Sequence, residues 1–141
     1  MQAFFSFPRH FAPVVDGDVL PDAPETLLAS GNFNKDVTVM SGTVKDEGSF
    51  YYRLTLNTFS SNGYDDNFLD HKLPRMLPVI SGFHSKLYPI TRLVRKHYFV
   101  NVDMENEDEF RPKYTDFLSD LLFTRCVAKF NDHMVQHNVK T

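Results

Sequence analysis

The sequence contains no tryptophan and a single cysteine, Cys126. One cysteine excludes an internal disulfide and gives no paired-cysteine motif for metal or redox chemistry. No apolar run approaches the roughly 18 residues of a membrane-spanning helix. The first residues, MQAFFSFPRHFAP, lack a basic stretch before their apolar patch, so we expect no signal peptide there. These absences argue against disulfide-rich, redox-active and membrane-spanning classes of protein.

Positive charge and metal-ligand motifs are also scarce. The formal net charge is −3, which gives no general attraction to phosphates, so we expect no nucleic-acid partner. None of the six histidines lies in an H-E-x-x-H pattern. His133 and His137 have a helical spacing that could hold zinc, but no third ligand lies near them in the sequence. We therefore predict no metal site and surface positions for the histidines.

Aromatic residues are abundant by contrast. The 141 residues include 14 Phe and 6 Tyr, and aromatics make up 14% of the chain. The length suits one domain, which we place over residues 1–141. A small domain has few places to bury so many rings, so they indicate part of a larger core or a lined pocket.

A short helix is predicted after an extended segment with a turn at Asp16-Gly17. Asp22 is an N-cap candidate, with Glu25 three residues further on as in a capping box. Pro24 suits the first turn, and Gly31 is a natural stop.

Residues 77–100 and 114–137 carry longer helical patterns. Apolar residues in each recur every three or four positions along one stripe, and on this basis Cys126 is predicted to be buried and inert. The acidic run DMENEDE, 103–109, lacks the spacing of a calcium loop. We expect it to be a solvated loop that places favourable charge at a helix N-terminus. The two stripes are Leu87, Ile90, Leu93 and Val94, and Phe123, Cys126, Val127, Phe130 and Met134.

One segment, Val37 to Gly42, is predicted to be a short strand. It fits a buried parallel strand better than an exposed hairpin arm. In parallel sheets, chemistry gathers at the carboxyl ends of strands, where Lys45, Asp46 and Glu47 would lie. A lone strand cannot satisfy its backbone hydrogen bonds, so we expect its neighbours to come from other polypeptide.

Three collinear pieces around this strand carry a family resemblance. They are PVVDGDVLPDAP at 13–24, LLASGNFN at 27–34 and KDEGSF at 45–50. Together they resemble the carboxylesterase type B family, the cholinesterase-like branch of the α/β-hydrolases. The resemblance is strong over residues 11–52 and weaker over 53–141. It implies an α/β fold in the form of a partial α/β-hydrolase, with an acid-bearing strand, the helices after it and an incomplete central sheet.

The resemblance implies roles for the loop after the strand. Glu47 would be the acid of a Ser-His-Glu triad, which orients the imidazole and stabilises its cationic form during attack on an ester carbonyl. Asp46 would brace the loop, with a role as the acid itself as the alternative. Gly48 would relieve crowding where the chain turns. Phe50 and Tyr51 match ring positions beside the acyl and choline sites of cholinesterases, and a role as core residues stays equally open.

Two members of such a triad are missing from the chain. No G-x-S-x-G motif, which carries the family's nucleophile, occurs in the sequence. The family's histidine lies further downstream than this chain reaches. We therefore expect a fragment of a serine carboxylic ester hydrolase that is inactive alone.

The intact protein would act on a small-molecule carboxylic ester through an acyl-serine intermediate, with no cofactor. The resemblance also implies an extracellular, secreted or membrane-anchored location, and the sequence does not indicate an oligomeric state. Two alternatives stay open. The chain could be a piece of a catalytically dead adhesion relative, or a small domain with an unrelated interaction role.

Overall fold

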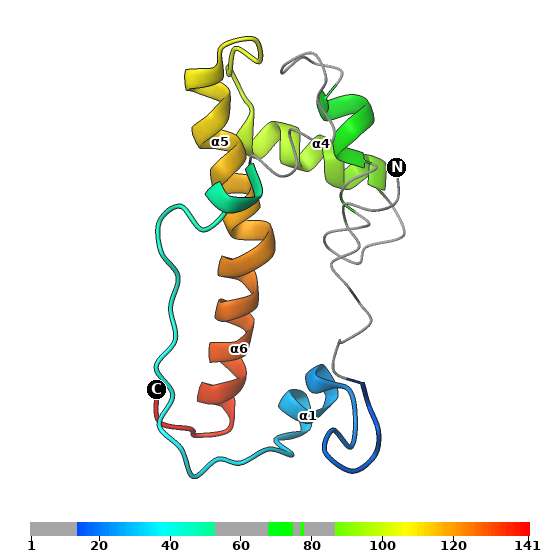
Figure 1. The fold of residues 1–141 in the computed structure, drawn as a ribbon, viewed down its shortest axis with the longest axis vertical. Coiled ribbons are helices and arrows are strands. Elements are labelled where there is room, and N and C mark those ends of the chain that lie inside the picture. Colours follow the sequence, from blue (N-terminus) through cyan, green and yellow to red (C-terminus); the bar gives the residue numbers. More distant parts are fainter. Residues whose placement is uncertain (1–13, 53–67, 75–76, 78–86) are drawn as a thin grey trace. The chain divides into compact units, whose positions relative to one another are not determined.

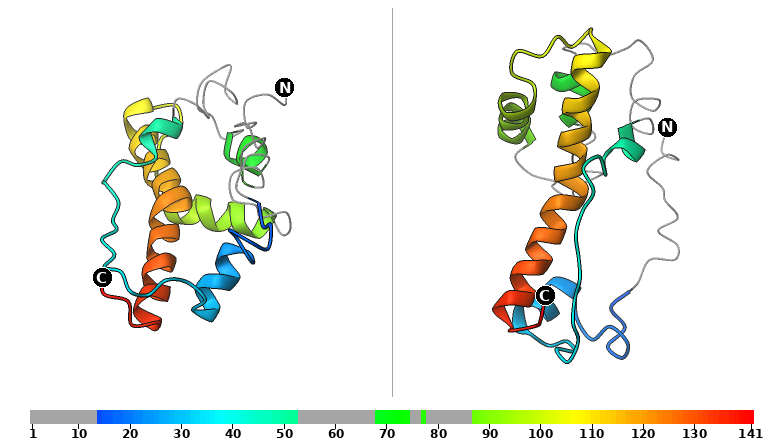
Figure 2. Two further views of the ribbon diagram at one scale, coloured as in Figure 1. Left: turned by 60° about the horizontal axis from the view of Figure 1, so that its bottom comes forward. Right: turned by 90° about the vertical axis from the view of Figure 1, so that its left-hand side faces the viewer.

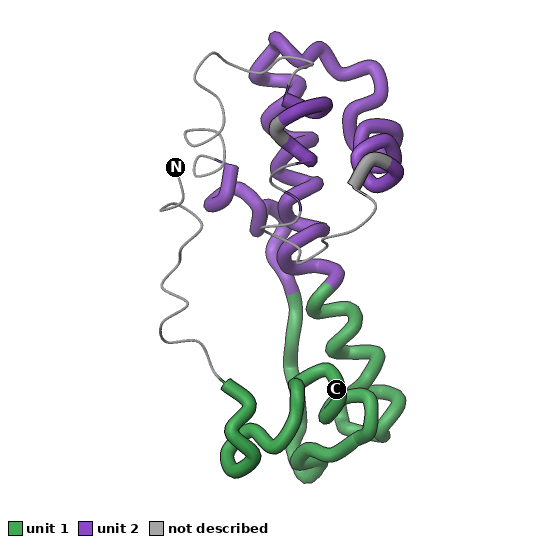
Figure 3. The backbone as a smooth tube through the Cα atoms, turned by 90° about the vertical axis from the view of Figure 1, so that its right-hand side faces the viewer, with its two compact units in different colours: residues 1–42, 126–141 green, residues 43–125 purple. Residues whose placement is uncertain are grey.

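The computed structural model describes residues 14–52, 68–74, 77 and 87–141. The chain divides into two compact units (Figure 3), the first with residues 1–42 and 126–141 and the second with residues 43–125. Helices dominate the described residues of both units. In chain order (Figure 1) they are α1 (Pro24–Ser30), the π-helical turn η2 (Phe68–Lys72), α4 (Leu87–Tyr98), α5 (Glu107–Ser119), the π-helical turn η3 (Asp120–Thr124) and α6 (Arg125–Gln136).

The short helix α1 begins later than the sequence predicts. Ala23 precedes a proline and is extended, with φ −56° and ψ 136°, because the proline ring disfavours a helical conformation there. The helix therefore starts at Pro24, and Asp22 is one residue too early to cap it. The Asp22 carboxylate instead accepts a hydrogen bond from the Ala23 amide at 2.6 Å. The predicted stop is confirmed, since Gly31 ends the helix in the left-handed region at φ 70°.

The end of α1 packs against the residue that follows α6. A Cβ built on Gly31 would lie 2.6 Å from Nδ1 of His137, so the site requires glycine for space as well as for its φ. The His137 ring lies edge-on to Phe33, with centroids 5.7 Å apart. Its Nε2 is 3.3 Å from the Ala29 carbonyl oxygen. These contacts join the two sequence segments of the first unit, residues 1–42 and 126–141.

The predicted strand over Val37 to Gly42 is reduced to one bridge. Thr38 pairs in parallel with Lys140, and the Val39 amide donates to the Lys140 carbonyl at 2.9 Å. The C-terminal residues accordingly lie beside this segment in every view (Figures 1 and 2). Within the described residues no other backbone pairs with it, so a ladder cannot form. The side chain of Met40 is fully exposed.

The second unit is built on an aromatic core. Phe110, Tyr114 and Phe117 recur along one face of α5, and successive rings stack with centroids 5.3 and 6.1 Å apart. Phe68 from η2 meets Phe110 and Tyr114 edge-on at 5.7 and 5.2 Å. Phe68, Phe110 and Tyr114 are completely buried. Such pairs add about 0.5–1.5 kcal/mol each beyond the apolar area they bury. Some of the abundant rings of the sequence thus form this core.

Helix α5 begins seven residues before the predicted start at Tyr114. Asn106 is its N-cap, and the Asn106 side chain accepts a hydrogen bond from the Asp108 amide at 3.1 Å. Glu107, Asp108 and Glu109 form the first turn, so the predicted acidic charge at a helix N-terminus is confirmed. The prediction that these three residues belong to a loop is wrong, because Asn106 supplies a cap that starts the helix before them.

The two predicted apolar stripes are only partly buried. On α4, Leu93 is 65% exposed while Thr91 is buried. Cys126 is exposed, so its predicted burial is wrong, whereas Met134 is buried. Cys126, Val127, Phe130 and Met134 all lie within α6 and keep their register. Helical spacing predicts which residues share a face but not whether anything covers that face, and Met134 alone of these four is buried in the described structure.

The histidines within the described residues follow the prediction in part. His71 and His97 are exposed, while His133 and His137 are half-buried. His10 and His84 lie outside the described residues. None of the described helices has the combination of length and apolar content that crossing a membrane requires.

Candidate functional site

The last of the three pieces that carry the family resemblance, residues 45–50, begins with a compact turn. We call Lys45 to Gly48 the acid loop; it is a turn followed by a helical segment at 49–52. The Asp46 carbonyl accepts from the Ser49 amide at 3.0 Å. The Gly48 carbonyl accepts from the amides of Tyr51 and Tyr52, both at 3.0 Å. The backbone on the C-terminal side of the acid loop is therefore hydrogen-bonded rather than open to solvent.

Glu47 is half-buried within this turn. Its Oε1 accepts a hydrogen bond from the Val44 amide at 3.1 Å. Within the described residues this is the one hydrogen bond to the Glu47 carboxylate. The bond closes the loop onto its own N-terminal side. The Asp46 side chain is exposed.

Gly48 joins the acid loop to α5. It is buried, and its amide donates to Oγ of Ser119 at 2.8 Å. The Ser119 hydroxyl in turn donates to the Thr115 carbonyl at 2.8 Å. A Cβ built on Gly48 would lie 2.6 Å from the Ser119 amide nitrogen and 2.7 Å from Cβ of Leu118. Only glycine allows the backbone of the loop to come this close to the helix.

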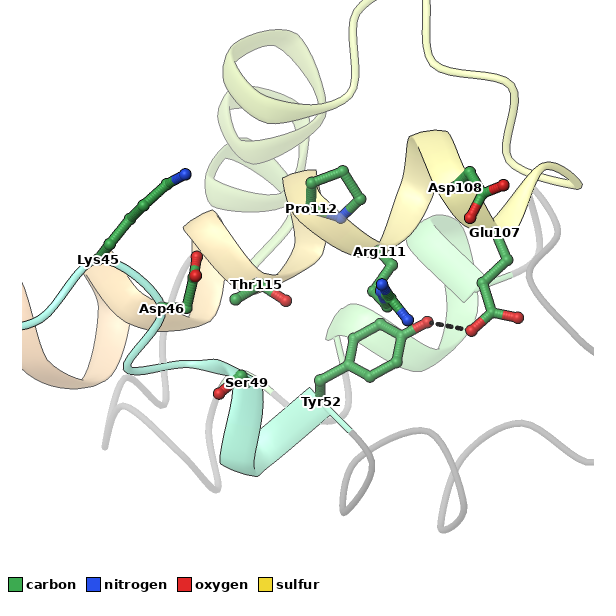
Figure 4. Close-up of a pocket in the computed structure, with 9 residues that line it drawn as sticks. All are labelled: Lys45, Asp46, Ser49, Tyr52, Glu107, Asp108, Arg111, Pro112 and Thr115. Carbon is green, nitrogen blue, oxygen red and sulfur yellow. Dashed lines mark hydrogen bonds between the residues drawn. The ribbon is translucent and has the colours of Figure 1, made fainter.

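A cleft of about 580 Å³ lies between the acid loop, the helical segment 49–52 and α5 (Figure 4). The Tyr52 hydroxyl donates to Oε1 of Glu107 at 3.3 Å, and Arg111 lies beside this pair. Lys45 lies at the opposite end of the cleft. The lining side chains are those of Lys45, Asp46, Ser49, Tyr52, Glu107, Asp108, Arg111, Pro112 and Thr115.

The walls of this cleft carry charges of both signs together with hydroxyl groups. No histidine lines it within the described residues, so Ser49 has no imidazole base there. Glu47 does not line the cleft either.

The two predicted pocket rings lie outside this cleft. Phe50 is 66% exposed, and Tyr51 is half-buried. Their rings meet edge-on, with centroids 5.3 Å apart, and Tyr51 also approaches Phe123 at 6.0 Å. The ring that lines the cleft is the next one, Tyr52. The sequence alone did not single it out, because nothing local shows that α5 packs on that side.

A second, smaller cleft of about 320 Å³ shares Lys45 with the first. Tyr98 lines it, and its hydroxyl donates to Oδ2 of Asp120 at 2.8 Å. Burial, followed by this hydrogen bond and the nearby negative charge of Asp120, raises the pKa of the Tyr98 hydroxyl well above its ordinary value. The phenol therefore stays protonated and remains a donor to Asp120 throughout the physiological pH range.

No group of three or more His, Cys, Asp or Glu side chains is arranged to hold a metal ion in the part of the chain that the structure describes. Of the pair considered for zinc, His137 approaches the Ala29 carbonyl, as given above. Nδ1 of His133 is buried without a hydrogen-bond partner.

The chain is similar to known carboxylesterases. The model of the carboxylesterase family matches residues 2–141. An acetylcholinesterase of Bungarus fasciatus is 49% identical over 61 residues, which is 43% of this chain and 10% of that protein. An acetylcholinesterase of Electrophorus electricus is 51% identical over 41 residues, 29% of this chain and 6% of that protein.

A third relative has a different description. The inactive carboxylesterase-like protein VdtD of Byssochlamys spectabilis is 29% identical over 82 residues, 57% of this chain and 14% of that protein. The matched stretches thus span about a tenth of the length of these three curated relatives. No solved structure gives a significant match.

Proposed function

Because the chain belongs to the carboxylesterase family, as its sequence motifs predict, we propose that it is part of a serine carboxylic ester hydrolase in which Glu47 is the acid of a Ser-His-Glu triad. The nucleophile and the histidine would come from polypeptide outside this chain, since no G-x-S-x-G motif occurs in it. The intact protein would hydrolyse small-molecule carboxylic esters through an acyl-serine intermediate, with no metal or organic cofactor.

The observation that carries this proposal is that hydrogen bonds fix the backbone around Glu47. A triad acid must hold an imidazole to within about half an ångström, so it needs a fixed backbone around it. Glu47 is half-buried in a turn that is hydrogen-bonded on both of its sides, at Val44 and at Gly48. A solvated surface acid, the alternative for this residue, would need no such anchoring.

The bridge between Thr38 and Lys140 supports a partial α/β-hydrolase fold over residues 1–141. Parallel neighbours in a sheet are joined by a long crossover that usually contains a helix. Residues 38 and 140 pair in parallel, and helices occupy much of the described sequence between them. We infer that this bridge is the beginning of a parallel pair in an incomplete central sheet, and that the acid loop follows its first strand.

The other predicted site residues take supporting roles in this proposal. Asp46 and Gly48 shape the acid loop, Asp46 through its carbonyl bond to the Ser49 amide and Gly48 through its contact with α5. Phe50 and Tyr51 would line the substrate pocket once the rest of the protein surrounds them. A cationic group over such rings gains roughly 0.5–2 kcal/mol each. The proposed location is extracellular, by analogy with the cholinesterase-like branch.

A catalytically dead relative is the second candidate. It is favoured by the match to a protein described as an inactive carboxylesterase-like protein. The two candidates differ in polypeptide outside this chain, at the position of the nucleophile. The coding sequence upstream of these residues separates them, because a G-x-S-x-G motif there supports the hydrolase and a replaced serine supports the dead relative.

The direct test is ester hydrolysis by the intact protein that contains this chain. Glu47→Gln keeps the size of the side chain and removes the charge that stabilises the imidazolium, so kcat should fall about 10⁴-fold. Glu105→Gln, the same change at an exposed residue, is the matched control and should leave kcat within about threefold. A larger loss from Asp46→Asn than from Glu47→Gln would transfer the acid role to Asp46.

The purified chain alone gives a second test of the fragment proposal. It lacks the motif for the nucleophile, so it should not hydrolyse a chromogenic ester above the rate in buffer. Ester turnover that Glu47→Gln abolishes in this purified chain would contradict the proposal.

A further inference from the structure

Ser119, the last residue of α5, is buried against the backbone of the acid loop. It is 5% exposed. Its hydroxyl uses both of its capacities, since it accepts from the Gly48 amide and donates to the Thr115 carbonyl, each at 2.8 Å. Glu47 is the residue directly before Gly48. The hydroxyl of Ser119 therefore joins α5 to the peptide that carries the proposed triad acid.

The acid loop packs so closely against α5 at Gly48 that there is no room for a side chain. A Cβ at Gly48 would collide with the Thr115 carbonyl oxygen, the Ser119 amide nitrogen and the Leu118 side chain. The α-helical pattern also ends at this point, because the π-helical turn η3 begins at Asp120. π-Helical turns are frequent at functional sites, where they let a helix accommodate a local feature.

A second serine shows what a purely local role would be. Ser30, in the last turn of α1, donates to the Leu27 carbonyl at 3.2 Å and is exposed. The Ser119 hydroxyl makes the same kind of bond one turn back in its helix, and in addition accepts from a residue 71 positions away in the sequence. That additional bond has no function in holding the helix.

We propose that Ser119 is a positioning residue for Glu47, a role that rests on the proposed function of Glu47 as the triad acid. The Glu47 carboxylate receives its hydrogen bond from Val44, the residue directly before the acid loop, and no hydrogen bond from another element reaches it within the described residues. Its place relative to the helical scaffold is therefore set through the backbone at Gly48. Loss of the Ser119 hydroxyl releases this anchor and lets the carboxylate move away from the imidazole.

The test is a double-mutant cycle on Ser119→Ala and Glu47→Gln in the intact protein, with ester hydrolysis as the readout. Misplacing a catalytic group by about 1 Å costs on the order of 100-fold, so Ser119→Ala should lower kcat about 10- to 100-fold. If Ser119 acts through Glu47, the same substitution in the Glu47→Gln background should change kcat by less than about threefold. A merely structural role would lower activity equally in both backgrounds.

The pH profile gives a second readout. A carboxylate beside the imidazole raises the pKa of the histidine, so its displacement lowers that pKa. The acidic limb of the kcat/KM profile should therefore move to lower pH in Ser119→Ala, in the same direction as in Glu47→Gln. An acidic limb that stays in place contradicts the proposal.

Further variants keep the test decisive if Ser119→Ala folds poorly. Gly48→Ala pushes the loop away from α5 and should show the same loss of kcat and the same dependence on Glu47. Ser30→Ala, the matched control, should keep parent activity. If Glu47→Gln alone leaves kcat intact, the proposed function fails and this inference fails with it. If Glu47→Gln is inactive while Ser119→Ala and Gly48→Ala keep full activity, only the inference is overturned.

Discussion

The two units of this chain differ in how completely they bury their apolar side chains. In the second unit, Phe68 of η2 meets the stacked rings of α5 edge-on, and Phe68, Phe110 and Tyr114 are completely buried. In the first unit, Val37 is 43% exposed and Met40 is fully exposed, on a segment with a single bridge. The difference teaches that the second unit anchors the acid loop through its own residues, whereas the segment over residues 37–42 has a single backbone partner within the described residues.

The largest contrast is expected between two phenylalanines. Phe110→Ala removes a completely buried ring, which should lower the free energy of unfolding by about 3–5 kcal/mol. Phe50→Ala removes a ring that is 66% exposed and should change it by less than about 1 kcal/mol. Urea titrations followed by tyrosine emission can measure both, because the chain has no tryptophan. Equal losses from the two substitutions would contradict the assignment of the core.

A smaller effect is expected at the glycines of the first unit. Gly31→Ala places a Cβ in the left-handed region at φ 70° and against the His137 ring, which should cost about 1–2 kcal/mol. Gly42→Ala is the matched control, because nothing lies within 4 Å of its Cβ position. Thermal melts of the two variants test this, and a less stable Gly42→Ala than Gly31→Ala would count against the described end of α1.

The smallest expected effect on stability comes from the Tyr98 hydroxyl, and it depends on pH. The folded protein holds the phenolic proton more tightly than the unfolded chain, so the stabilisation is present below the ordinary tyrosine pKa of about 10. It is lost as pH rises beyond that value toward the raised pKa of the folded state.

Tyr98→Phe removes the hydrogen bond to Asp120, so it should be about 1 kcal/mol less stable than the parent at pH 8. The difference should shrink as the pH is raised above about 10. Melting curves of both proteins from pH 8 to pH 11 measure it. A gap that widens with pH would reverse the sign of the coupling.

Local signals in the sequence predicted the end of α1 but not its start. Gly31 ends the helix in the left-handed region of backbone conformation, which glycine adopts more readily than other residues. Its role as a stop can therefore be predicted from the residue type alone. Asp22 has cap chemistry as well, but the proline after Ala23 sets the start of the helix one residue too late for it. A rule on the residue before proline would have placed the helix correctly.

The helices after it were predicted with errors of a different kind. The acidic run ahead of α5 suits both a solvated loop and a first helical turn, and Asn106 was the available signal for a helix start at Glu107. The exposure of Cys126 could not be predicted, because helical spacing indicates which residues share a face of α6 but not what packs against that face.

In the candidate site too, residues recognised from their sequence neighbours could be predicted, whereas residues that matter through tertiary contacts could not. The family motif singled out Glu47 and Gly48 as candidates from neighbouring residues. It could not single out Ser119 or Tyr52, because their contacts arise only when α5 packs against the acid loop. The predicted strand likewise depends on partners that are distant in sequence, and within the described residues its one partner is Lys140.

Residue-resolved amide hydrogen exchange of the purified chain tests the central claim most directly. If the chain itself builds the seat of the acid loop, the Gly48 amide, which is buried and bonded to Ser119, should exchange orders of magnitude more slowly than the amide of fully exposed Met40. Gly48 exchanging as fast as Met40 would mean that the loop is not anchored to α5, and would contradict the account.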